Sequence, residues 1–116
     1  MPAPAPQLAP LPPAALHILL ALAGEDRHGY ALMQEVERQS GGSYKLGPGT
    51  LYDNLERLSQ QGLVRRLAAE DGDSRRRYYR LTAAGKRTLS VEVRRIETAI
   101  REARSRLPEL SPETAP

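Results

Sequence analysis

The spacing of hydrophobic and polar positions divides the middle of the chain into three short helices. Residues 13–23 are apolar on most sides, so we expect this helix to be buried by more than one neighbour. A second helix, over residues 29–40, carries a narrow apolar stripe and stops at two consecutive glycines. The third begins at Pro48 and stops at Gly62, and its leucines fall at i, i+4 and i+7, which predicts one buried face.

A short β-hairpin is expected after the third helix. Strands over residues 63–70 and 75–81 flank the turn sequence Asp-Gly-Asp-Ser at 71–74. Three helices followed by a hairpin are typical of a helix-turn-helix with a wing. The alternation of side chains along a strand places four residues on two faces: Tyr79 with Leu81, and Tyr78 with Arg80.

The last segment has the longest regular pattern in the chain. Thr82 is expected to cap a helix over residues 83–107, in which apolar residues recur at spacings of 4, 3, 4, 3 and 4. The helix could pack entirely on its own domain. However, at about 25 residues it is too long for a core this small to cover, which favours pairing with a second subunit. The expected dimerisation seam consists of Leu89, Val93, Ile96, Ile100, Ala103 and Leu107.

The fold class that follows is mainly α with a small β-hairpin. We expect a winged helix-turn-helix domain over residues 12–82 and a long C-terminal dimerisation helix over residues 83–107. The two ends, residues 1–11 and 108–116, are rich in proline and lack hydrophobic periodicity. Both are therefore expected to be disordered tails.

Positive charge is concentrated on the third helix and the hairpin. The whole chain has a formal net charge of +3 and a pI of about 9.6. Residues 14–44 carry two basic and four acidic side chains, a net of −2, whereas residues 45–87 carry ten basic and five acidic ones, a net of +5. A merely solvated basic surface is the alternative, but this placement favours an electrostatic footprint for phosphate.

The start of the third helix holds the candidate DNA-reading residues. Gly49 lets the backbone approach a groove, Thr50 and Asn54 can contact base edges, and Tyr52 is the tyrosine expected at the surface. Asp53 opposes this interpretation mildly, because a carboxylate repels phosphate. An ordinary solvated helix face is the competing interpretation.

Five cations are the candidate phosphate contacts. Strand alternation sends neighbouring arginines to opposite faces, so three in a row cannot all reach the same run of phosphates. Their alternative role is to guard an exposed strand edge. The five residues are Lys45, Arg57, Arg75, Arg76 and Arg77.

The sequence gives no sign of catalysis or of a bound cofactor. It has no cysteine, and its two histidines lack the carboxylate cluster of a metal site, so they are expected in helix packing and capping. No Ser/His/Asp order or phosphate loop is present, so we expect no enzyme, no catalytic residue, no metal and no cofactor. The apolar stretch at 14–23 is shorter than the ~20 residues that span a bilayer and lacks a charged leader. A cytoplasmic protein without a membrane partner is therefore expected.

Three motifs together resemble the PadR family of bacterial transcriptional regulators. They are HGYALMQEV at residues 28–36, GPGTLYDNLERL at 47–58 and RRRYYRLTAAGK at 75–86. The resemblance extends over about residues 16–95, and the combination is specific although each motif alone is weak. This chain has Asp53 where the family pattern often has proline.

The resemblance implies a winged-helix homodimer in which the C-terminal helix packs with the first helix, here through Leu16 and Leu19. It also implies a repressor that binds double-stranded DNA, with AT-rich half-sites, and that is often released by a small-molecule effector or a stress signal. Capture of a flat aromatic ligand between tryptophans, known in the family, does not carry over because the chain has no tryptophan.

Two other classes compete with a DNA-binding regulator. A winged helix can serve as a protein-interaction module that never touches DNA, although such a module should lack the positive charge over residues 45–87. A ligand-sequestering protein is disfavoured because no large aromatic cavity is suggested.

Overall fold

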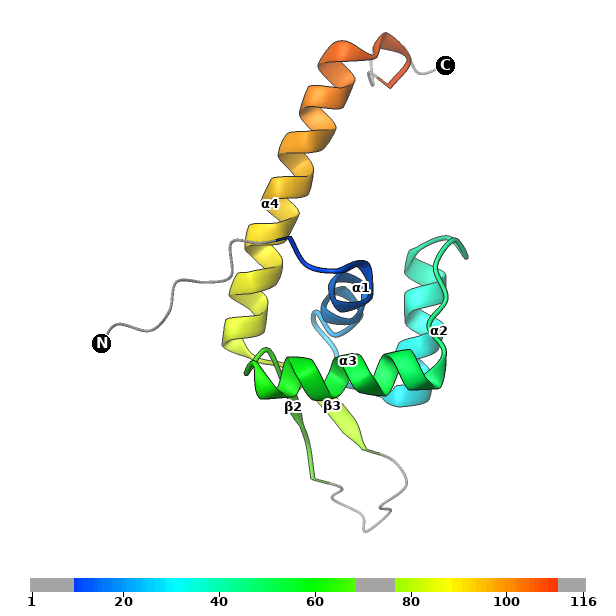
Figure 1. Ribbon diagram of the computed structural model, residues 1–116, viewed down its shortest axis with the longest axis vertical. Coiled ribbons are helices and arrows are strands. Elements are labelled where there is room, and N and C mark those ends of the chain that lie inside the picture. Colours follow the sequence, from blue (N-terminus) through cyan, green and yellow to red (C-terminus); the bar gives the residue numbers. More distant parts are fainter. Residues whose placement is uncertain (1–9, 69–76, 111–116) are drawn as a thin grey trace, which may run out of the picture.

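The computed structural model of the chain describes residues 10–68 and 77–110. It is mainly helical with one small antiparallel sheet, as predicted, and Figure 1 shows a compact body from which the last helix projects. In chain order the elements are α1 (Pro13–Ala21), β1 (Arg27–His28), α2 (Gly29–Gln39), α3 (Pro48–Gln60), β2 (Val64–Arg66), β3 (Tyr78–Leu81), α4 (Ala83–Arg106) and the 3-10 helix η1 (Pro108–Leu110).

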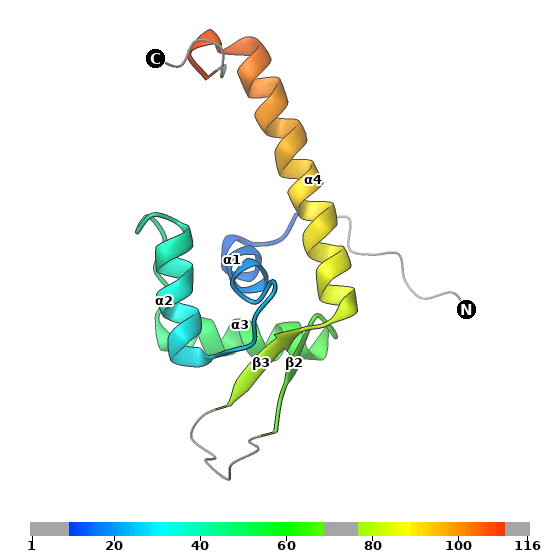
Figure 2. The same cartoon turned by 180° about the vertical axis from the view of Figure 1, so that it is seen from behind.

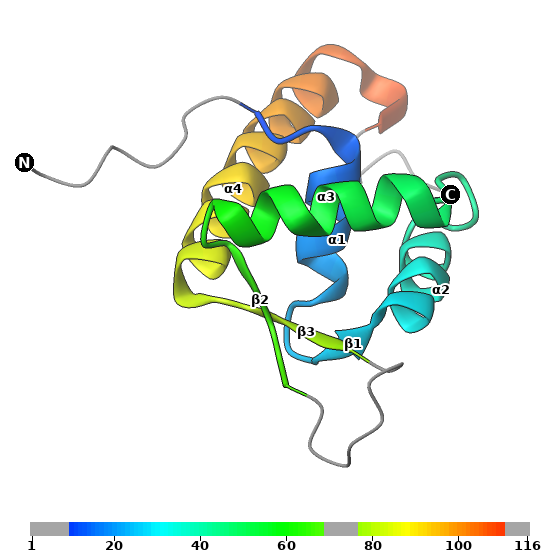
Figure 3. The ribbon, with the colours of Figure 1, turned by 60° about the horizontal axis from the view of Figure 1, so that its bottom comes forward.

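Helix α1 forms the centre of the core, as its apolar sequence predicted. It begins at Pro13, which suits a first turn because proline has no N–H to leave unpaired. The helix packs against α2, α3 and α4. Figure 3 shows α3 lying across α1. Helix α2 lies beside the start of α3, and the sheet lies beside the end of α3. The largest fully buried side chains are Ile18, Leu19, Leu22, Leu32, Val36, Leu51 and Leu55.

The sheet has three strands, whereas the sequence predicted two. Strand β1, only two residues long, pairs antiparallel with β3, so that β3 lies between β1 and β2. A two-residue strand has no periodicity to recognise. The expected alternation in β3 is confirmed, since Tyr79 and Leu81 are buried while Tyr78 and Arg80 are exposed.

The strands of the wing are shorter than expected in the described part of the chain. Strand β2 ends at Arg66, although the backbone N–H of Leu67 still donates to the carbonyl of Tyr78 at 2.8 Å. The end of the predicted first strand, its turn and the start of the second fall mostly on residues 69–76, outside the described residues.

Helix α4 is joined to the core at its first three turns. Thr82 caps it as predicted, because the side-chain Oγ1 accepts a hydrogen bond from the N–H of Gly85 at 3.0 Å. Gly85 lies against the carbonyl of Leu63, where a side chain would collide with backbone. The buried residues of α4 end at Glu92, and the rest of the helix extends away from the body (Figure 2). In the described residues, no helix is both long enough and apolar enough to cross a membrane.

Each expected tail includes residues that have a defined place in the structure. The backbone N–H of Leu11 donates to Oε2 of Glu92 at 3.2 Å, so the chain is tied to α4 before α1 begins. At the other end, Pro108–Leu110 forms η1 in a stretch that was expected to be disordered. The sequence signal for disorder was proline content, which does not exclude a short 3-10 turn.

Candidate nucleic-acid interface

Helix α3 presents one face to the core and the opposite face to solvent. Leu51, Leu55 and Leu58 are buried against the body, as their spacing predicted. Gly49, Thr50 and Arg57, all candidate contacts, are exposed. The helix therefore has an outward face that a groove of DNA could accept, with polar and small side chains on it.

The glycines at the start of α3 have no role in packing. A Cβ placed on Gly47 or Gly49 would meet nothing within 4 Å, and neither residue has a positive φ. Glycine in a helix costs stability because it orders a very flexible backbone. Gly47 is the N-cap of α3, a position that favours glycine, so the cost applies only to Gly49, which lies inside the first turn. Among the described residues nothing packs there, so the close approach of another molecule explains Gly49 best.

Asn54 is not on the outward face. It is only half exposed, and its side-chain amide donates to the backbone carbonyl of Thr50 at 2.8 Å. Its position on α3 lies next to the buried leucines. It lies on one flank of the helix, nearer the leucines than Thr50 and Arg57, and is therefore less exposed than they are.

Tyr52 lies on the other flank and joins α3 to α2. Its side chain is 49% exposed, in line with the surface position expected for it. The hydroxyl lies against Gly29 at the start of α2, where a Cβ would collide with it. Gly29 thus has a local packing reason, in contrast to Gly49.

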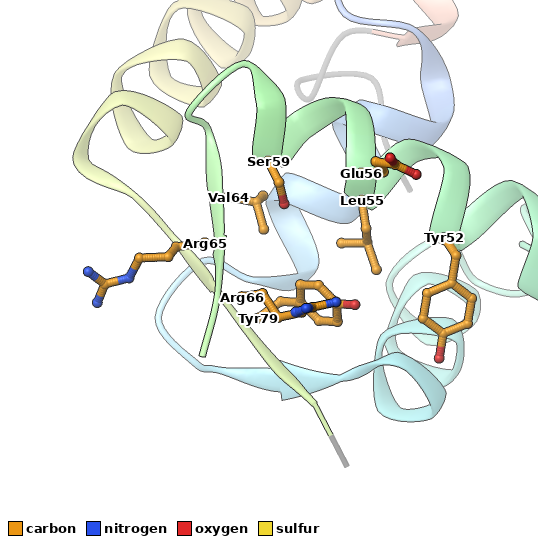
Figure 4. Close-up of a pocket in the computed structure, with 8 residues that line it drawn as sticks. All are labelled: Tyr52, Leu55, Glu56, Ser59, Val64, Arg65, Arg66 and Tyr79. Atoms are coloured by element: carbon orange, nitrogen blue, oxygen red, sulfur yellow. The ribbon is translucent and has the colours of Figure 1, made fainter. Parts of the chain in front are cut away.

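A groove runs between α3 and the wing. Its volume is about 510 Å³, and its floor consists of buried apolar side chains of α3, β2 and β3. Figure 4 shows Tyr52 and Glu56 above it on α3, with the arginines of β2 on the opposite side. The lining residues are Tyr52, Leu55, Glu56, Ser59, Val64, Arg65, Arg66 and Tyr79.

Arg65 and Arg66 were not among the residues singled out from the sequence, yet both border this groove. Both are exposed, but only the side chain of Arg66 is directed towards the groove. In the sheet register Arg66 is opposite Tyr79 and Arg65 is opposite Arg80. Arg66 therefore lies on the side of the sheet that faces α3, and Arg65 on the other side. Figure 4 shows the same divergence. Strand alternation applied to the first strand would have found this pair.

The other predicted cations have different surroundings. The ammonium of Lys45 lies 3.2 Å from a carboxylate oxygen of Glu37, and both side chains are exposed, so this ion pair is weak. Arg57 and Arg77 are exposed. Arg75 and Arg76 lie outside the described residues.

An ion pair fixes the far side of the wing to the body. The guanidinium of Arg80 donates two hydrogen bonds to Asp26, at 3.1 and 2.8 Å, in the bidentate arrangement that favours arginine. This hydrogen bonding, with the nearby charges of Arg80 and Arg65, lowers the pKa of Asp26. The contact joins the turn after α1 to the middle strand of the sheet.

The second candidate surface is the exposed part of the seam on α4. Val93, Ile96, Ile100 and Leu107 are 37–45% exposed in the single chain, and Ala103 is half-buried. Large apolar side chains repeated along one helix are typical of a surface that another chain covers.

Two of the predicted dimerisation residues belong to the core instead. Leu19 is fully buried against its own protomer and Leu89 is nearly so, so neither has a surface to offer a partner. Leu16 is half-buried, and Leu20, one turn further along the same face, is exposed. The sequence did not single out Leu20 as exposed, because nearly every position of α1 is apolar. Without a polar face, the pattern does not show which side of a helix is turned to solvent.

Comparisons with known proteins agree with this arrangement. The family model described as the transcriptional regulator PadR-like family matches residues 18–91. The transcriptional regulator Rv3488 of Mycobacterium tuberculosis (strain ATCC 25618 / H37Rv) is 42% identical over 88 residues, which cover 75% of this chain and 78% of that protein.

Solved structures share the fold. A PadR family transcription regulator from Clostridium difficile R20291 matches with a TM-score of 0.68 at 23% identity, covering 81% of this chain and 97% of that one. PadR of Bacillus subtilis, solved in complex with operator DNA, matches with a TM-score of 0.61 at 22% identity, covering 71% of this chain and 46% of that one.

Proposed function

This chain belongs to the PadR-like family of transcriptional regulators, and from that premise we propose that it is a DNA-binding repressor that acts as a homodimer on an inverted-repeat operator. The observation that carries the proposal is the outward face of α3, with Gly49 on it, beside a groove bordered by the exposed Arg66. A helix of this kind enters the major groove, and the wing follows the adjacent backbone.

Electrostatics support duplex DNA as the partner. The net charge of +5 over residues 45–87 coincides with α3 and the wing, while residues 14–44 are net negative. A polyanion is therefore attracted to one end of the molecule. Binding of this kind weakens steeply as salt rises. Lysine and arginine side chains release the counterions condensed on DNA, and this release is less favourable when the salt concentration in solution is high.

The seam on α4 supports the homodimer. Among the residues that the structure describes, the large apolar side chains beyond Glu92 are exposed. Pairing two such seams about a two-fold axis removes them from water and presents two copies of α3. Two half-sites about one helical turn apart, ~34–36 Å, then form an inverted repeat.

Repression needs nothing beyond occupation of the operator, since a bound dimer excludes other proteins from the same stretch of DNA. A small-molecule effector would release the repressor if it favoured a dimer in which the two α3 helices no longer match the half-site spacing. The compartment that this function requires is the one that holds the chromosome, which in a bacterium is the cytoplasm.

The test is selection of bound fragments from the source genome with the full chain, followed by footprinting of the recovered sites. We expect a small set of fragments that share an inverted repeat, with protection of both half-sites. Recovery of fragments without a shared sequence, even at low salt, would contradict a specific regulator. Tight binding to another protein with little dependence on salt would instead support the interaction module.

A further inference from the structure

We infer that Asp53 and Glu56, and not Asn54, read base edges, and that the base they select is cytosine. This inference rests on the proposed function, since it concerns the same face of α3. It goes beyond that function by naming the residues that set specificity and the chemical group they recognise.

The geometry of α3 places Asp53 near the centre of its outward face and Glu56 on the same face, towards the wing. Gly49, Asp53 and Glu56 stand at i, i+4 and i+7, which puts them on one face of a helix. Each buried leucine of α3 comes two residues after one of these three. Two residues correspond to a rotation of about 200° around a helix with 3.6 residues per turn. The face with Asp53 and Glu56 is therefore the one opposite the core.

The two carboxylates are free to meet a ligand. Both side chains are exposed, and neither forms a hydrogen bond or ion pair with any residue in the described ranges 10–68 and 77–110. Asn54, by contrast, has its amide committed to the carbonyl of Thr50 and lies beside the core. Gly49, on the same face, leaves open space where a side chain would hold the DNA away.

The chemistry of a carboxylate then decides the base. An ionised carboxylate only accepts hydrogen bonds, so guanine and the carbonyl edge of thymine repel it in the major groove. Cytosine offers its N4 amino group as a donor. Adenine also has an amino group, but its N7 acceptor lies beside it and repels the second carboxylate oxygen.

The same two negative charges lower the affinity for DNA that lacks cytosine at the contacted positions. A carboxylate pointing into a groove between phosphates costs free energy unless a donor meets it. Asp53 and Glu56 should therefore lower affinity for most DNA while leaving it high where cytosine stands at the contacted position. A half-site with at least one fixed C·G pair is the expected result, rather than the uniformly AT-rich half-site that the family resemblance suggested.

The experiment is in vitro selection from a randomised duplex library with four full-length chains: wild type, Asp53→Asn, Glu56→Gln and Glu109→Gln. The last is the matched control. It removes the same charge from an exposed carboxylate of η1, at the far end of α4 from α3 (Figure 1). Thermal unfolding of each chain checks that the exposed substitutions leave the fold intact.

We expect wild type and Glu109→Gln to select the same sites, with cytosine fixed at one or more positions of each half-site. Asparagine and glutamine pair with adenine, so each of the other variants should shift one such position from C·G towards A·T. The preference at that position should change roughly 5- to 150-fold, the range of one good base contact. Binding to an unrelated mixed-sequence duplex should tighten for the same two variants and stay unchanged for the control.

Two outcomes contradict different claims. If wild type selects a defined site that Asp53→Asn and Glu56→Gln leave unchanged, the assignment of the reading residues is wrong while the proposed function stands. If wild type selects no site at all, even at low salt, the proposed function itself fails.

Discussion

At the scale of single residues, some glycines are explained by packing within the chain and others are not. Gly85 and Gly29 lie where a side chain would collide with Leu63 or Tyr52, so the fold itself explains them. Gly49, in the first turn of α3, lies in open space among the described residues. A residue that weakens its helix without helping the protomer is evidence for a surface shaped to meet something else.

This contrast gives a prediction for Gly49→Ala. Alanine is a better helix former and has room here, so the free energy of unfolding should rise, by up to about 1 kcal/mol. The added methyl group stands on the outward face, so affinity for the selected operator should fall. Urea unfolding and fluorescence anisotropy on the same variant measure both quantities. Unchanged affinity together with higher stability would mean that DNA does not approach this face closely.

Residue-level expectations from the sequence were right where burial decided them. The leucines of α3, the cap at Thr82 and the two faces of β3 follow from periodicity and are confirmed. Asn54 stands 100° around the helix from Asp53, so its side chain lies nearer the core and is less exposed. Its hydrogen bond to Thr50 depends on a rotamer that no sequence pattern encodes.

At the scale of elements, the wing combines a structural ion pair on one side of the sheet with an apolar-floored groove on the other. The Asp26–Arg80 pair anchors the outer side of the sheet, and the cross-strand neighbours Arg65 and Arg80 would otherwise repel each other there. On the inner side Arg66 faces the groove. Neighbouring arginines of one strand therefore have different tasks.

The wing offers a matched pair of substitutions. Arg66→Ala should weaken binding to all duplexes alike and reduce the salt slope by about one, the loss of one phosphate contact. Arg65→Ala, which removes the same side chain from the other side of the sheet, should change both much less. Salt titrations of the two variants against one duplex give the comparison. An equal loss for both would show that the side of the sheet does not decide phosphate contact.

The anchor of the wing predicts a dependence on pH. Because the pKa of Asp26 is lowered in the folded chain, its contribution to stability is present at neutral pH and is lost as the pH falls through that lowered value. Asp26→Asn should therefore unfold at a lower temperature than wild type at pH 7, and the gap should begin to close below about pH 4. The effect should be modest, since the pair is partly exposed. A gap that is constant from pH 7 to pH 3 would mean that this carboxylate does not stabilise the fold through its charge.

Among the elements, the four helices and the wing were predictable and β1 was not. A long amphipathic segment contains enough apolar positions to show its helical period. The heptad spacing predicted α4 to within one residue of its end. Strand β1 forms because the fold brings the turn after α1 beside the free edge of β3. Such a tertiary contact is not visible in the local sequence. The division of Arg65 and Arg66 between the two faces follows from alternation, once the register is known.

At the scale of the whole molecule, α4 connects the DNA-facing end to the proposed dimer. Its first three turns pack on the core as far as Glu92, and the remaining turns carry Val93, Ile96 and Ile100 on an uncovered seam. Since the first part is fixed to the body, the geometry of the pairing would set the distance between the two α3 helices.

Two substitutions in the seam test this arrangement. Ile96→Lys combined with Ile100→Lys places charges where apolar contacts are expected, so the dimer should dissociate while each wing domain stays folded. Light scattering should give the mass of one chain, against two for wild type, and binding to an inverted repeat should weaken strongly. Glu97→Gln, on the same helix but outside the seam, is the control and should remain dimeric. A monomeric wild type at micromolar concentration would end the dimer hypothesis.

The most direct test of the central claim is one titration. A labelled duplex that carries the recovered inverted repeat and a scrambled duplex of equal length and composition are each titrated with the wild-type chain, at several salt concentrations. We expect two chains per duplex, a preference for the inverted repeat of at least roughly 10³-fold, and steep weakening of both affinities as salt rises. Equal affinity for the two duplexes at every salt concentration would contradict it.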